Sequence, residues 1–121
     1  MQIKETIERD TAQLAFSGDL LGEPDGLNVR RTIQTLVAGK VKHVAIDLGE
    51  VRHINSAGLG SLVAALITMR KSGGDIRLAR VGRNVQNVFV ITRLVKIFDT
   101  HETVDEALKA FQAARGTLPP L

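Results

Sequence analysis

The sequence predicts a single α/β domain whose sheet combines an antiparallel hairpin with mostly parallel strands. Two observations lead to this class. The chain opens with two segments in which apolar and polar residues alternate, and beyond them short apolar runs alternate with helical patterns. Neighbouring strands joined by a tight turn pair antiparallel, whereas strands joined through helices become parallel by right-handed crossovers. Helices are therefore expected to cover a mixed sheet.

The first half of the chain is expected to form a hairpin, a helix and a buried strand. Residues 3–7 and 12–16 alternate between apolar and polar, with a charged break between them. From 27 to 38 the apolar residues share one helical face, which ends at Gly39. The run His43–Leu48 is short and β-branched, so it indicates a buried strand.

The second half repeats the alternation of helix and strand. From Leu59 the apolar residues recur at helical spacing until a pair of glycines, which makes this the clearest helix of the chain. Residues 75–80 predict a strand, 84–92 a short helix and Val95–Phe98 the final strand. Thr103–Glu106 has the form of a capping box that begins a terminal helix.

The predicted order of elements is ββαβαβαβα, in one domain that spans residues 1–121. A chain of 121 residues, with 44% hydrophobic and 24% charged residues, has the ordinary size and composition of a single globular domain. No internal repeat, linker or low-complexity segment divides it. The pair Pro119-Pro120 indicates that residues 115–121 form a frayed tail.

The composition also bears on the possible function classes. The chain has no cysteine, which excludes disulfides, thiolate metal sites and cysteine nucleophiles. His43, His53 and His101 lack the spacing of metal ligands, so we expect surface or loop histidines, no metal and no other cofactor. The charged N-terminus is unlike a signal peptide and no apolar run reaches the length of a membrane span. The cytoplasm is the expected location.

The segment before the clearest helix carries the strongest functional signal. Asn55 or Ser56 can cap the helix, which stabilises it by about 1 kcal/mol relative to alanine. Gly58 and Gly60 in the first turn each cost about 1 kcal/mol relative to alanine, so a compensating reason is expected. They leave room around Ser56 for another backbone, a kinase active site or a phosphate. Close packing of the helix on the sheet is the alternative.

This segment resembles the Asp-Ser-(Ser/Thr/Ala)-Gly-Leu-Gly signature of the STAS family of anti-sigma-factor antagonists. The matching residues are Asn55, Ser56, Ala57, Gly58, Leu59 and Gly60. The resemblance continues through Val44–Leu48 before the signature, Gly73–Ile76 after the helix, and Val85–Phe98. It therefore covers most of the chain. It implies a STAS-like mixed sheet covered by helices, with the signature serine at a helix N-terminus.

The resemblance implies a protein-binding switch rather than an enzyme. In such antagonists the unphosphorylated domain binds an anti-sigma factor that is also a serine kinase, which releases the sigma factor. Phosphorylation of the signature serine, here Ser56, breaks the complex, and the residues from Asn55 to Gly60 are the implied contact surface. A phosphatase is a further implied partner, and a homodimer stays open.

Two residues depart from the family pattern: Arg93 stands where members often have a small residue before the last strand, and the other departure is Asn55. Asn55 stands where the typical member carries aspartate. Asparagine can still cap the helix, but it offers no negative charge for a kinase to recognise. The alternative function is therefore a STAS scaffold, or a subunit of a larger signalling assembly, that is not phosphorylated.

Two rival function classes have weaker support. A nucleotide-binding enzyme would need a third glycine or a P-loop lysine near Gly58, and neither is present. Asp47 and Asp99 each end a predicted strand, so we expect turn or capping residues there rather than catalytic ones. We predict no enzymatic turnover.

A nucleic-acid-binding module is the second rival. Its candidate contacts cluster near the last predicted strands and are Arg77, Arg80, Arg83, Arg93 and Lys96. The net charge is only +3, and four phenylalanines are the only aromatic residues among Phe, Trp and Tyr, so a base-stacking surface is largely missing. We expect a solvated polar face instead, with no direct contact to nucleic acid or membrane.

Overall fold

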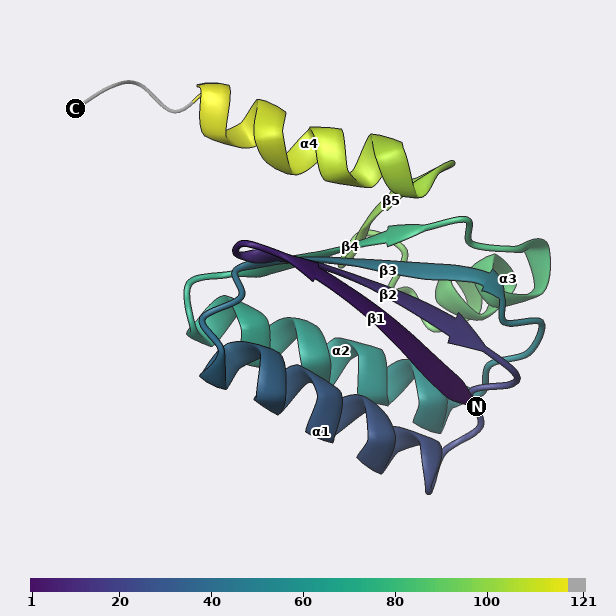
Figure 1. Ribbon diagram of the computed structural model, residues 1–121. Coiled ribbons are helices and arrows are strands. Elements are labelled where there is room, and N and C mark those ends of the chain that lie inside the picture. The colour runs from purple at the N-terminus through teal and green to yellow at the C-terminus, as the bar shows by residue number, and fades with distance from the viewer. Residues whose placement is uncertain (118–121) are drawn as a thin grey trace.

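The fold is a five-stranded mixed sheet with helices on both faces (Figure 1). The computed structural model describes the backbone of residues 1–117 and the side chains of residues 1–112. Its elements are β1 (Gln2–Glu8), β2 (Thr11–Ser17), α1 (Asp25–Ala38), β3 (His43–Glu50), α2 (Ser56–Lys71), β4 (Asp75–Ala79), α3 (Arg83–Ile91), β5 (Asp99–His101) and α4 (Val104–Thr117). This order and the α/β class confirm the prediction from the sequence.

The strands lie in the order β1-β2-β3-β4-β5. β1 pairs antiparallel with β2, whereas β2, β3, β4 and β5 are parallel to one another. Because parallel strands end on the same side of a sheet, the segments that follow β2, β3 and β4 emerge together at one edge. The chain enters α2 and α3 from this edge.

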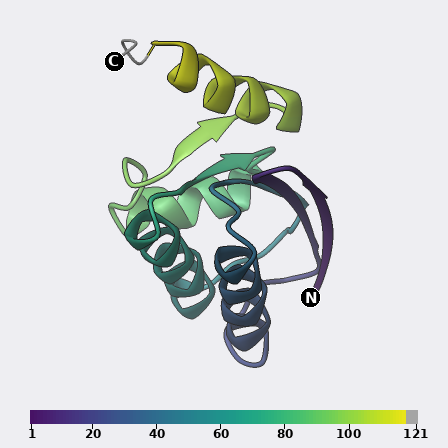
Figure 2. The same ribbon diagram turned by 60° about the vertical axis from the view of Figure 1, so that its left-hand side comes forward.

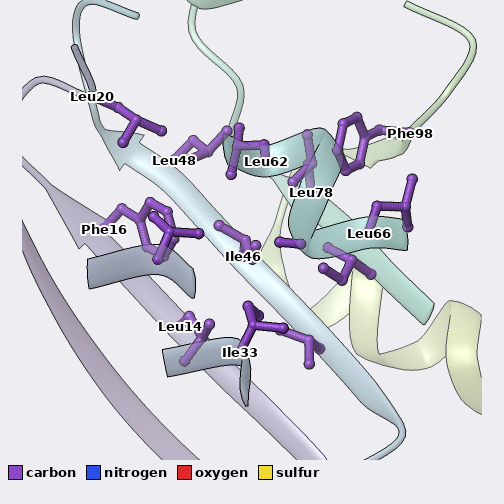
Figure 3. Close-up of a cluster of buried hydrophobic side chains, with 14 of the residues drawn as sticks. Leu14, Phe16, Leu20, Ile33, Ile46, Leu48, Leu62, Leu66, Leu78 and Phe98 are labelled. Atoms are coloured by element: carbon purple, nitrogen blue, oxygen red, sulfur yellow. The ribbon is translucent and has the colours of Figure 1, made fainter. Parts of the chain in front are cut away.

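The main core lies between the sheet and the helices α1, α2 and α3, while α4 covers the opposite face (Figures 1 and 2). Successive residues of a strand point to opposite faces, so alternate residues of β3 enter this core. The buried side chains labelled in Figure 3 come from the central strands, the helices and the loops: Leu14, Phe16, Leu20, Ile33, Ile46, Leu48, Leu62, Leu66, Leu78 and Phe98.

Helix α4 packs over a second and smaller cluster. Its Ala107 and Phe111 meet Ala45 of β3 and Ala79 of β4, and the larger side chains of His43 and Arg77 pack beside the Phe111 ring. Half of the predicted capping box forms: the N–H of Glu106 donates to the hydroxyl of Thr103 (3.1 Å), whereas the Glu106 carboxylate accepts the N–H of Glu102 (3.3 Å) instead of that of Thr103. Helix α4 extends to Thr117, three residues into the expected frayed tail, and residues 118–121 lie outside the described residues.

The position of the final strand was predicted wrongly. Residues 95–98 form turns, and β5 begins only at Asp99. Phe98 packs against α3 instead of extending the sheet, because it is buried and stacks on Phe89 with 6.0 Å between ring centroids, whereas Val95 is exposed.

Candidate functional site at the start of helix α2

The loop between β3 and α2 is held by the segment that follows β2. Val51 and Ile54 anchor the loop because their side chains are buried. Leu20 forms a parallel bridge with Ile54, and its N–H donates to the carbonyl of His53 (3.0 Å). Two segments from the same edge of the sheet thus fix the place where α2 begins.

Asn55 caps α2 and ties the two loops together. Its backbone is extended, and its Oδ1 accepts a hydrogen bond from the N–H of Gly58 (2.8 Å). Its Nδ2 donates to the carbonyl of Leu21 (2.9 Å). The sequence left the cap open between Asn55 and Ser56. The structure assigns it to Asn55, and Ser56 becomes the first residue of the helix.

The two glycines in the first turn of α2 differ in what a side chain at their position would meet. A Cβ built on Gly58 would overlap the carbonyl oxygen of Leu20, so this residue is glycine because the helix packs closely on a neighbouring backbone. The neighbour is the loop after β2 rather than the sheet. A Cβ on Gly60 would meet no atom within 4 Å. Packing inside the domain therefore accounts for Gly58 but not for Gly60.

The helix divides the six signature residues between core and surface. Leu59 is 1% exposed and belongs to the main core, and Gly58 is buried as well. The remaining residues, Asn55, Ser56, Ala57 and Gly60, are exposed. Only these four can present a side chain or an uncovered backbone to another molecule.

The exposed face of α2 carries no charge over most of its length. From Ile54 to Met69 the sequence has no Asp, Glu, Lys or Arg. The exposed helical positions within this uncharged stretch, which we call the open face of α2, are Ser56, Ala57, Gly60, Ala64 and Ile67, and the charged Arg70 and Lys71 follow only at the end of the helix. A surface helix normally places charged and polar residues on its outer side, so an uncharged outer side made of small residues is unusual. Signature matching missed Ala64 and Ile67, although the absence of charge was visible in the sequence.

The positive end of α2 is not compensated by an acidic side chain, because its first turn has none. The adjoining loops and the first turns of α1 contain two exposed pairs of ionisable side chains. His53 Nδ1 lies 3.4 Å from Asp19, and Arg30 lies 3.2 Å from Glu23. The helix dipole therefore leaves a partial positive charge at Ser56 that favours an anion.

The cations considered for nucleic-acid binding do not form one surface. Arg77 is largely buried, lies 5.4 Å from the Phe111 ring centroid of α4, and pairs with Asp99 (3.4 Å). Arg80 pairs with Asp47 (3.4 Å) and Glu50 (3.6 Å). Only the remaining candidates, Arg83, Arg93 and Lys96, are exposed without an ion pair among the described residues.

Asp47 and Asp99 make contacts that stabilise the sheet and its turns. Asp47 lies inside β3 and not at its end, and its carboxylate accepts the N–H of Gly49 (2.9 Å) besides pairing with Arg80. Asp99 begins β5 rather than ending a strand. The expected strand ends were therefore wrong at both residues.

The histidines are distributed over three separate places. His53 is exposed in a loop, as expected, but His43 lies in β3 with its ring centroid 4.8 Å from that of Phe111, and His101 lies in β5. The expectation of surface or loop positions was therefore wrong for His43 and His101, which both lie in strands and are partly buried. Within residues 1–112, no three His, Asp or Glu side chains come together in a way that could hold a metal ion. None of the described helices is both long and apolar enough to span a membrane.

The comparisons with known proteins agree with the fold. A family model described as the STAS domain matches residues 2–107. A Bordetella bronchiseptica protein named as an anti-sigma factor antagonist, BtrV, is 30% identical over 73 residues, which are 60% of this chain and 63% of that protein. The match thus spans less than two thirds of the length of this relative.

Solved structures show the same fold. A Thermotoga maritima protein described as an anti-sigma factor antagonist superposes with a TM-score of 0.82 at 24% identity, over 91% of this chain and 94% of that one. The phosphorylated form of the Bacillus cell fate determinant SpoIIAA has a TM-score of 0.71 at 18% identity, over 91% of this chain and 99% of that one. Together with a family model that matches nearly the whole described chain, these findings show that the chain belongs to the STAS domain family.

Proposed function

We propose that this chain is an anti-sigma-factor antagonist that works by binding a protein partner. The partner is an anti-sigma factor with serine-kinase activity, whose capture frees a sigma factor. The observation that carries the proposal is the open face of α2, an exposed and uncharged helix surface beside Ser56. The names of the similar proteins support the same role.

The chemistry of the open face suits contact with another folded protein. Burying Ala57, Gly60 and Ala64 removes no charge from water and orders no long side chain, so the usual costs of forming an interface are low. The absence of a side chain at Gly60 lets a partner backbone approach the helix closely. Ile67, which is 49% exposed, provides apolar area at the far end of the face.

Phosphorylation of Ser56 would turn this surface off. A phosphate adds about −1.5 to −2 charges at the first residue of α2, where the dipole is favourable and no carboxylate is near in the first turn. The domain itself should therefore tolerate the modification. A partner that covers the open face would have to remove water from the dianion, which opposes binding unless the partner supplies cations.

Asn55 favours a second candidate, a scaffold that is not phosphorylated. The amide of Asn55 makes a hydrogen bond to Leu21 that an aspartate carboxylate could not donate. This chain therefore uses asparagine for structure at the position where a kinase would meet an acidic residue in typical family members. In this case the open face would bind its partner without being switched.

Intact-mass measurement after incubation with ATP and each candidate kinase distinguishes the two functions. One phosphate on wild type, none on Ser56→Ala, and loss of the complex on phosphorylation support the switch. A stable complex in which only Asn55→Asp gains phosphate supports the scaffold. No complex with any candidate would contradict both.

The contact surface is tested by Ala64→Glu, which adds a charge to the open face. We expect it to weaken the complex at least about tenfold in isothermal titration, because the added charge must be desolvated. Ala38→Glu, at an exposed alanine of α1, is the matched control and should leave the affinity unchanged. Equal affinities for both variants would rule out the open face as the contact.

The remaining expectations belong to the same proposal. The chain would act in the cytoplasm without cofactor or turnover, and a phosphatase would restore the binding form of Ser56. Hydrolysis of common esters or nucleotides that is saturable and lost in Ser56→Ala would overturn the assignment as a non-enzyme.

A further inference from the structure

The C-terminal end of α3 exposes aliphatic side chains that neither the core nor the open face of α2 uses. Ile91 is 79% exposed, more than any other large apolar residue among those described, and Val90 and Val95 are 57% and 39% exposed. We call these three residues the α3 patch. They lie within six residues of one another, at the end of the helix and in the turn that follows it.

The patch is held in place by the core beneath it. Phe89, between Val85 and the patch, is fully buried, and its carbonyl accepts the N–H of Leu94 (2.9 Å). The carbonyl of Val90 accepts the N–H of Arg93, whose backbone is left-handed at φ 62°. The turn therefore fixes Val90, Ile91 and Val95 at the surface, where they cannot fold into the domain.

Positive charge accompanies the patch. Arg93 and Lys96 belong to the same turn region, and Arg83 stands at the start of α3. All three are exposed, and none of them forms an ion pair with a described residue. No acidic residue occurs from Val81 to Phe98. The apolar surface is thus accompanied by cations that pair with no acidic group among the described residues.

We propose that the α3 patch is a second docking surface, which binds an acidic protein segment that presents aliphatic side chains between carboxylates. The aliphatic side chains of the segment would cover Val90, Ile91 and Val95, and its carboxylates would pair with Arg93 and Lys96. The charges are complementary, and the apolar area supplies the affinity that surface ion pairs alone would not give. This surface lies on a different helix from Ser56, so its binding does not depend on the proposed switch.

The charge of the patch argues against two other occupants. In a symmetric dimer the same surface meets itself, so a second copy of this chain would bring cations against cations. An anionic membrane would attract the cations, but the patch has no Trp or Tyr to anchor it at the interface, and the other side of α3 is committed to the core.

The proposal is tested with a defined pair of synthetic helical peptides. Both place leucines along one face, and the flanking positions are glutamate in one peptide and lysine in the other. Fluorescence anisotropy measures the binding of each peptide to the full chain. We expect the glutamate peptide to bind more tightly, and its affinity to fall as salt is added.

Variants then locate the binding site. Ile91→Asp should weaken binding of the glutamate peptide about tenfold, because it removes buried apolar area and adds a repulsive charge. The matched control is Ile7→Asp, which changes a 49% exposed isoleucine on the edge strand β1 and should have no effect. Thermal melting of both variants verifies that they remain folded.

Several results would overturn the proposal. These are equal binding of the two peptides, equal effects of Ile91→Asp and Ile7→Asp, or no binding of the glutamate peptide. Binding of wild type, but not Ile91→Asp, to vesicles containing phosphatidylglycerol would assign the patch to membranes instead. Sedimentation showing a dimer that Ile91→Asp dissociates would assign it to a second copy.

Discussion

Replacing Asn55 by aspartate is expected to destabilise the domain, although aspartate is as good a helix cap as asparagine. A carboxylate keeps the hydrogen bond from the N–H of Gly58 and gains about 0.3–1 kcal/mol from the helix dipole. It loses the donor to the Leu21 carbonyl and brings an oxygen toward that oxygen, at a place where the present N–O distance is 2.9 Å. The balance depends on which of these effects is larger.

The magnitudes favour a net loss. The lost hydrogen bond costs about 0.5–1.5 kcal/mol, and we take the contact between two oxygens to add a similar amount unless the loop moves. After the gain from the dipole, the free energy of unfolding should fall by about 1 kcal/mol, which lowers the melting temperature by about 3–6 °C in a domain of this size. Asn55→Ala loses both hydrogen bonds and should cost about 2 kcal/mol.

Urea denaturation at several pH values tests this reasoning. The new carboxyl should have a raised pKa in the folded state, because its protonated form can donate to Leu21 and its charged form cannot. Folding then favours the protonated form, so the deficit of Asn55→Asp relative to wild type should be largest at neutral pH and shrink near and below about pH 4. A variant as stable as wild type at neutral pH, with no such trend, would refute the role assigned to the Asn55 amide.

Three further predictions concern stability. Gly58→Ala should lower the free energy of unfolding by about 1–3 kcal/mol because its Cβ meets the Leu20 carbonyl, whereas Gly60→Ala should raise it by up to about 1 kcal/mol. Chemical denaturation measures both changes, and similar effects of the two substitutions would contradict the packing described. Lys40 lies in the turn that ends α1 and has a left-handed backbone at φ 62°. Lys40→Gly should therefore raise the free energy of unfolding by about 1 kcal/mol, and a lower melting temperature would contradict this. Phe111→Ala should cost about 3 kcal/mol and speed amide exchange in α4; unchanged exchange there would show that Phe111 does not anchor the helix.

Most of the fold could be predicted because each main element carries its own periodic pattern. The helix that became α2 is an example, since its buried residues recur at helical spacing and its cap is a short polar side chain. β5 is the counterexample. It is three residues long, contains no apolar residue, and exists because it pairs with β4, so no local pattern could show it.

The candidate site could be located from the sequence, but the sequence alone could not show which of its residues are buried and which are exposed. The signature does not show which residues face inward, and only the loop after β2 explains why Gly58 must lack a side chain. The same loop decides that Asn55, rather than Ser56, is the cap, because it supplies the second hydrogen bond. Both facts depend on a contact between segments more than 30 residues apart in the chain.

The small side chains of the open face have a consequence for fidelity in a cell that contains several related domains. Alanine, glycine and serine offer few contacts that distinguish one helix from another, so a partner that binds only this face would accept many similar helices. Discrimination between related domains must then come from the loops that adjoin the open face, where Leu21 is half exposed and where Arg52 and His53 are exposed. Exchanging these loop residues between related domains would be the direct way to change which partner each domain binds.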